Sequence, residues 1–166
     1  MKHFKINSCN FDVDVEETKQ YYESITLCNC VGCSNFYLQV KTAYPSVAEF
    51  LNKFGVNIEK PDEIFWTDIE NGVILYNTID YTVSGSFRDA GDVVLAHFND
   101  GKVKVYITSG FVCPNSQQGE YFTLSVVGIE LPTILEYPKT HIISGNKRGI
   151  RGIFNRIIEK IKELRH

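Results

Sequence analysis

The sequence predicts an α+β fold in which N-terminal helices pack on a mainly antiparallel sheet, followed by a C-terminal amphipathic helix. Three observations predict it. Helical patterns fill residues 14–54, alternating β-branched and aromatic residues fill residues 63–132, and apolar residues return at helical spacing over 153–164. With 166 residues, of which 43% are hydrophobic and 22% charged, the chain is long enough to bury a core without cross-links.

The first strands and the first helix are predicted from alternating apolar residues and from a helix-capping motif. Residues 4–13 alternate loosely between apolar and polar side chains, which predicts one or two short strands. Asp14 precedes Glu17 by three positions, and this spacing is that of a capping box. We therefore expect the first helix to begin at Asp14.

Two further helices are predicted before the sheet region. Ser34 is a suitable N-cap for a helix that ends at Pro45. Ser46 and Glu49 form a second capping box, which predicts a third helix directly afterwards. Gly55 follows that helix at the position where a C-terminal glycine cap is expected.

The region from residue 63 to residue 132 is predicted to form the sheet. Asn71-Gly72 and Asn99-Asp100-Gly101 are hairpin-turn sequences that join neighbouring strands. Leu131-Pro132 is expected to close this region. The predicted strands are Ile64–Thr67, Val73–Val83, Val93–Phe98, Val103–Thr108 and Tyr121–Ile129. The carboxylates near them, including Asp62 and Asp80, are expected to form a solvated rim because most fall at strand ends or turns.

Charge divides the chain into two parts. Residues 1–138, predicted to form a single α+β domain, hold 9 Lys and Arg against 18 Asp and Glu, a net charge of −9. Residues 139–166, predicted to form a basic linker and an amphipathic helix, hold 8 against 2, a net charge of +6. We expect the apolar face of this helix to pack back on the sheet, because an apolar stripe must be buried.

The basic tail is also the predicted partner-binding segment. A protein partner is favoured, and residues 150–166 offer an alternative peripheral contact with a membrane. Nucleic acid is disfavoured because the acidic body repels a polyanion. The candidate partner-binding residues are Arg148, Arg151, Arg156 and Lys160.

Cellular location is inferred from hydropathy. The sequence has no apolar run near the length that spans a bilayer and no signal-peptide core after Met1. The cytoplasm is therefore the predicted compartment. The chain has five cysteines, an odd number, which argues against a fully paired disulfide framework.

The segment Cys28-Asn29-Cys30-Val31-Gly32-Cys33 is the main candidate site. Cys30 and Cys33 form a C-x-x-C pair, which lets two thiolates reach one ion, and Cys28 adds a third sulfur. Gly32 is expected to ease a left-handed turn in this loop. The predicted cofactor is zinc, which needs a fourth ligand for a closed site. Its candidates are Cys9, Cys113, His3 and His97.

Two alternatives to the metal site remain open. The first is a thiol–disulfide redox pair of Cys30 and Cys33, with Cys33 activated by its position just before the helix expected at Ser34. The second is that the three thiols are reduced and simply fill space in the core. No second C-x-x-C is present to complete a four-cysteine zinc array.

The cysteine segment also carries a resemblance. Residues 28–36, with Phe50-Leu51 and the Gly-Val-Asn-Ile-Glu-Lys-Pro-Asp-Glu sequence of residues 55–63, resemble a group of small uncharacterised bacterial proteins. That group shares a C-x-C-x-x-C-x-N-F signature and a K-P-D-E segment. The similarity covers roughly residues 1–138 and leaves the basic tail outside. It implies a shared fold of the body and carries no activity with it.

The sequence contains no recognisable catalytic constellation. The four histidines are scattered, and none lies beside a serine or cysteine in a catalytic pattern. We therefore expect a non-catalytic cytoplasmic binding or accessory module with a structural zinc site. The competing expectations are a thiol–disulfide enzyme or sensor, and a protein that binds membranes or nucleic acid through its C-terminal helix.

Overall fold

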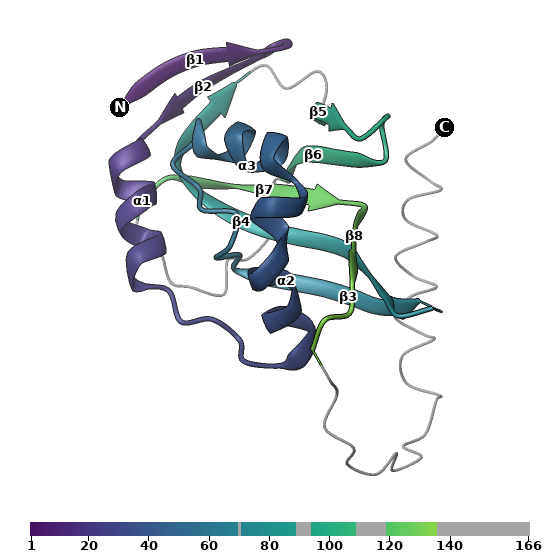
Figure 1. Cartoon of the computed structure of the whole chain (residues 1–166). Helices are drawn as coiled ribbons and strands as arrows, with labels where there is room; N and C mark the ends of the chain where they lie inside the picture. Colours follow the sequence, from purple (N-terminus) through teal and green to yellow (C-terminus); the bar gives the residue numbers. More distant parts are fainter. Residues whose placement is uncertain (70, 89–93, 109–118, 136–166) are drawn as a thin grey trace, which may run out of the picture. The chain divides into compact units, whose positions relative to one another are not determined.

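A computed structural model of the chain describes residues 1–69, 71–88, 94–108 and 119–135 (Figure 1). These residues form three helices and an eight-stranded sheet in which all pairs of strands are antiparallel. The α+β fold class is thus confirmed for this part of the chain. The strand order is β1-β2-β4-β7-β6-β5, with β3 and β8 also paired to β4.

The chain begins with a hairpin of β1 (Lys2–Ile6) and β2 (Cys9–Val13), as the alternation predicts. Helix α1 (Val15–Ser24) follows, and the Asp14 side chain accepts the backbone N–H of Glu17 at 3.0 Å. This is half of the predicted capping box. The Glu17 carboxylate instead accepts the Ser84 hydroxyl at 2.7 Å, which joins α1 to the sheet.

Helix α2 (Val31–Ala43) begins one turn earlier than the sequence predicts, because Cys30 and not Ser34 is its N-cap. The Cys30 sulfur accepts the backbone N–H of Cys33 at 3.5 Å, and its carbonyl accepts the N–H of Ser34 at 2.9 Å. A sulfur atom therefore takes the place of the oxygen that usually caps a helix. Cys33 consequently lies inside the first helical turn.

Helix α3 (Pro45–Asn52) starts directly at its proline. The predicted Ser46–Glu49 capping box is wrong, because the fixed φ of Pro45 already suits the first helical position and places Ser46 inside the helix. The predicted glycine cap is confirmed. Gly55 has a φ of +84°, and the N–H groups of Gly55 and Val56 bond to carbonyl groups of the last turn in a Schellman arrangement.

Both predicted hairpin turns are confirmed by backbone geometry. Asn71 and Gly72 have φ values of +72° and +71°, and residues 99–101 also have positive φ. The predicted strand at residues 121–129 is instead divided at Gly128, which has a φ of +82°. The strands are β3 (Glu63–Ile69), β4 (Val73–Arg88), β5 (Val94–Phe98), β6 (Val103–Thr108), β7 (Tyr121–Val127) and β8 (Ile129–Pro132).

Strand β4 is the centre of the sheet. Along one edge it pairs first with β3 and then with β2, and along the other edge with β8 and then with β7. Helix α1 covers the gap between β3 and β2. There the Tyr22 hydroxyl donates to the Thr82 carbonyl at 2.8 Å, and the Ser84 N–H donates to the Thr18 hydroxyl at 3.0 Å.

The core lies between this sheet and the helices, with α2 and α3 on one face (Figure 1). At the hairpin end it consists of phenylalanine rings whose neighbouring centroids lie 5.1–6.5 Å apart. We call this set the phenylalanine cluster. Its members are Phe4, Phe11, Phe50, Phe54, Phe87, Phe98 and Phe122.

The predicted basic linker and amphipathic helix of residues 139–166 lie outside the described residues. They include all four predicted partner-binding residues. Within the described part of the chain, no helix combines the length and apolar character needed to cross a bilayer.

Candidate functional site

The three cysteines of the loop between α1 and α2 lie close together. The sulfur atoms of Cys28, Cys30 and Cys33 are all within 4.8 Å of one another. Cys28 and Cys30 are exposed, whereas Cys33 is only 6% exposed. The three predicted ligands can therefore reach one ion from a single short segment.

Gly32 fixes this segment against the sheet, but not in the way the sequence suggests. It lies in the first turn of α2 and makes no left-handed turn. A Cβ at this position would lie 2.2 Å from Cε2 of Trp66 in β3. Glycine is needed because the indole ring packs directly on the helix backbone beside the sulfur atoms.

A buried hydrogen-bond network holds the same helical turn. The Tyr76 hydroxyl in β4 donates to the Gly32 carbonyl at 2.8 Å. The Asn35 side chain donates to the Tyr76 hydroxyl at 3.2 Å and to the Pro132 carbonyl at 3.1 Å. It also accepts the N–H of Ile134 at 2.9 Å. We call these residues the Asn35 network; it connects the start of α2 to β4 and to the end of β8.

The two thiols of the C-x-x-C pair differ in their electrostatic surroundings. Partial burial works to raise the pKa of Cys30, but hydrogen bonds from the Cys33 backbone and thiol, from Cys28 and from the Gly32 backbone outweigh it and hold that pKa below its ordinary value. Burial, and then the neighbouring Cys30, raise the pKa of Cys33 well above its usual range. The exposed sulfur is thus the more acidic one, opposite to the order expected for a helix beginning at Ser34.

Tyr37 is a neighbour of the site that the sequence analysis did not identify. Its hydroxyl is within hydrogen-bond reach of Cys33, and burial together with this contact raises its pKa above the ordinary value. Residues four positions apart lie on the same face of a helix. Tyr37 could therefore have been predicted beside Cys33 if the helix had been expected to include Cys33. No sequence signal indicated Trp66, which reaches the site from a distant strand.

Three of the four predicted fourth ligands belong to the described residues, and none of these three reaches the cluster. Among the described residues, no further Cys, His, Asp or Glu ligand atom joins the three sulfurs at the same spacing. Cys9 is buried at the start of β2, the ring of His3 bonds to Asp12, and His97 is exposed on β5. Cys113 lies outside the described residues.

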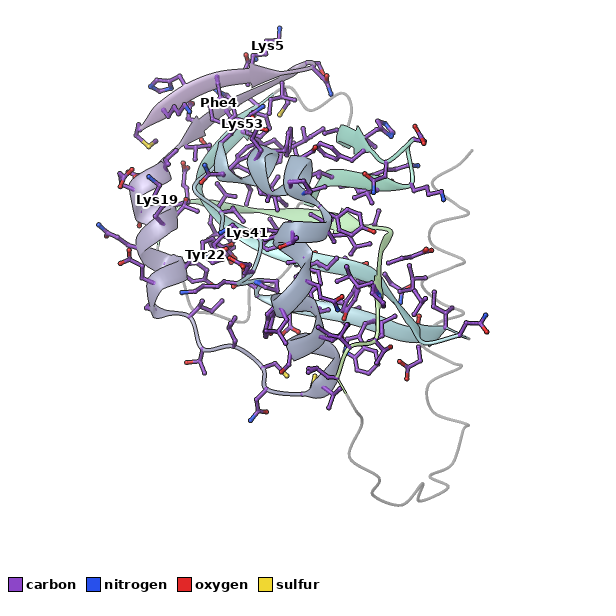
Figure 2. All side chains as sticks on the ribbon, viewed as in Figure 1. Phe4, Lys5, Lys19, Tyr22, Lys41 and Lys53 are labelled. Atoms are coloured by element: carbon purple, nitrogen blue, oxygen red, sulfur yellow. The ribbon has the colours of Figure 1, made fainter. Side chains whose placement is uncertain are left out.

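A groove of about 530 Å³ lies between α1, α2 and α3, apart from the cysteine loop. Figure 2 shows Lys19, Tyr22 and Lys41, which belong to its lining. Lys19 pairs with Glu16 at 2.8 Å, and Lys41 with Glu59 at 3.3 Å. Because acidic neighbours already neutralise these two lysines, we expect the groove to bind anions less strongly than its number of lysines suggests.

Asp80 corrects the prediction of a solvated carboxylate rim. Its side chain is 2% exposed, and one carboxyl oxygen accepts the Ser125 hydroxyl at 2.5 Å. Among the described residues, the other oxygen has no hydrogen-bond partner. Burial raises the pKa of this carboxyl, although the Ser125 bond works in the opposite direction. Asp80 does not form part of a metal-ligand cluster within the described residues.

No protein-family model matches the chain, and no curated protein or solved structure is significantly similar to it. The chemistry of the cysteine loop is therefore the basis for a functional proposal.

Proposed function

We propose that the protein is a small non-catalytic binding or accessory module whose cysteine loop binds zinc through Cys28, Cys30 and Cys33. The observation that supports this most is the separation of the three sulfur atoms, all within 4.8 Å of one another. Around a tetrahedral zinc ion with Zn–S bonds of about 2.3 Å, sulfur atoms lie about 3.8 Å apart. Small side-chain rotations are sufficient to move from one arrangement to the other.

The chemistry of the sulfurs favours a soft or borderline metal. Thiolates are preferred ligands of zinc and are poor ligands for magnesium or calcium. The high pKa of Cys33 means that metal binding must displace its proton. The affinity is therefore expected to fall as the pH is lowered.

One of the three ligands is held in place by the surrounding fold, whereas the other two face solvent. Trp66 and the Asn35 network hold the first turn of α2, which carries Cys33. Cys28 and Cys30 are exposed to solvent. We propose that water supplies the fourth ligand, as it does in zinc sites with three protein ligands.

Metal analysis of the purified, reduced full-length chain tests the proposal. We expect one zinc ion per chain, lost on treatment with a chelator and accompanied by a lower unfolding midpoint. Cys28→Ser and Cys30→Ser should each lose most of the zinc, and Asn29→Ala, an exposed change between the two ligands, should retain it. Cys113→Ser should also retain it, because water and not Cys113 completes the site.

Two results would contradict the proposal. One is a chain that binds no zinc and is equally stable with and without chelator. The other is equal loss of zinc in Asn29→Ala and in the two serine variants, since the loop conformation alone would then explain the effect.

The partner-binding part of the proposal depends on the basic residues 139–166. We propose that Arg148, Arg151, Arg156 and Lys160 contact an acidic protein surface. Replacement of all four by glutamine in the full chain should leave the unfolding midpoint unchanged and abolish co-purification of such a partner. Binding of the unaltered chain to phosphatidylserine vesicles, lost in the same variant, would instead indicate a membrane surface.

A further inference from the structure

The three thiols differ in their exposure to solvent. Zinc binding alone does not require such a difference. Cys33 is buried in the first turn of α2, whereas Cys28 and Cys30 are open to solvent. We propose that, when no metal is bound, Cys30 and Cys33 exchange with small disulfides, with Cys30 as the attacking thiol and Cys33 as the resolving thiol. This activity goes beyond the zinc proposal and does not depend on it.

Access decides which thiol reacts first. A disulfide from solvent can reach an exposed sulfur and cannot align with one that is 6% exposed. Between the two exposed thiols, Cys30 is the helix cap and accepts the backbone N–H of Cys33. This hydrogen bond and the positive end of the helix dipole stabilise negative charge on its sulfur. Cys28 lies in the preceding loop and caps no helix.

The positions of the two thiols also suit the second step. Cys30 and Cys33 occupy the cap and the third residue of one helix, so the backbone already brings their side chains to one side. Their sulfurs lie within 4.8 Å, and a disulfide requires about 2.05 Å. Rotation of the exposed Cys30 side chain can close this gap, while Gly32 stays in place beneath Trp66.

The reaction proceeds in two balanced steps. The Cys30 thiol loses its proton to solvent, and its sulfur attacks one sulfur of a low-molecular-weight disulfide. The disulfide bond breaks, and the leaving thiolate takes up a proton. Cys33 then loses its proton and attacks the Cys30 sulfur, which releases the second small thiol. The two protein thiols are oxidised to one disulfide and the small disulfide is reduced to two thiols.

Oxidised glutathione, added to the reduced and chelator-treated full-length chain, is a suitable probe. We expect two glutathione thiols released per chain and a Cys30–Cys33 disulfide, located by fragmentation of the tryptic peptide that holds all three cysteines. Cys33→Ser should accumulate one glutathione on Cys30. Cys30→Ser should react about two- to fivefold more slowly than the unaltered chain, by the advantage of a helix N-terminus. Cys28→Ser, the matched exposed control, should still form the disulfide.

A measurement without substitutions guards against a variant that fails to fold. Brief alkylation of the unaltered reduced chain should label Cys30 before Cys28 and leave Cys33 unlabelled. Equal labelling of Cys28 and Cys30, or a disulfide that includes Cys28, would overturn the proposed roles. Zinc content is measured separately before chelation, so a chain that lacks zinc but forms the disulfide would overturn only the metal proposal.

Discussion

The two ends of the sheet are joined to the helices by different kinds of contact. At the hairpin end, Phe4 of β1 and Phe11 of β2 contact the ring of Phe54, which follows α3 and in turn contacts Phe50 of that helix. At the other end, α2 meets β4 and β8 through the directed hydrogen bonds of the Asn35 network. Among the described residues, the exposed thiols lie only at the second end.

This difference shows how a fold can separate stability from chemistry. Ring packing contributes a large, non-directional term and tolerates small shifts of the chain. Hydrogen bonds fix positions more narrowly, because their strength depends on distance and angle. A ligand set that must converge on one ion is thus better supported at the hydrogen-bonded end.

Truncation of Phe11 should have the largest effect on stability. This side chain is 1% exposed and contacts four other rings. Phe11→Ala should lower the free energy of unfolding by about 3–5 kcal/mol, as measured by urea denaturation. Zinc content per folded chain should not change. A loss of zinc in the folded fraction would show that the two ends are not separable in this way.

Asn35→Ala should have a smaller effect on stability and a larger effect on the site. It removes the partner of the Ile134 N–H and one of the two donors to the Pro132 carbonyl, which Gln39 also bonds at 2.9 Å. It also leaves the Tyr76 hydroxyl with fewer bonds. We expect a loss of about 2 kcal/mol, from polar groups left unsatisfied. Zinc titration should show weaker binding. Unchanged affinity would mean that the network does not position the sulfurs.

Gly32→Ala should disturb the site through a steric clash and not through a lost bond. The added methyl group would overlap the Trp66 ring, so the helix start or the indole must move, at a cost of about 1–3 kcal/mol. Zinc affinity should fall together with the unfolding midpoint. The double change Gly32→Ala with Trp66→Leu should recover part of both, which a double-mutant cycle measures. Ser34→Ala, in the same turn, is the control.

The smallest effect is expected at Asp80, between the two ends. Its folded-state pKa is raised above the ordinary 3.8, so folding favours the protonated form. Its stabilising contribution is complete below pH 3.8 and is lost as the pH rises through the folded-state pKa. Asp80→Asn should therefore be more stable than the unaltered chain at pH 7 and equally stable at pH 3, in urea denaturation at each pH. Equal stability at both values would contradict the assignment.

Local sequence patterns predicted most of the elements, because their signals act over a few residues. The Asn71-Gly72 turn and the Gly55 cap depend on positive φ, which those residues adopt readily. The start of α2 was misplaced because a cysteine cap is not part of the usual N-cap preference. The kink at Gly128 was missed because its cause is distant: a Cβ there would lie 2.2 Å from the Lys102 carbonyl oxygen.

The sequence predicted the sulfur ligands of the site but not the residues from other strands that surround them. Close spacing in the sequence was enough to bring Cys28, Cys30 and Cys33 together. The failed candidates His3 and His97 illustrate the limit, since nothing in a single sequence reports which distant strand faces a loop. Trp66 and Tyr76 reach the site through strand register, which the residue pattern alone does not specify.

The central position of strand β4 has a consequence for how the protein unfolds. It is paired with β3 and β8 near the cysteine end and with β2 near the hairpin end, so a single polypeptide segment takes part in both. Neither end can melt fully without breaking backbone bonds of that segment. Unfolding of the body should accordingly be cooperative, and zinc bound at one end should slow amide hydrogen exchange in the distant hairpin.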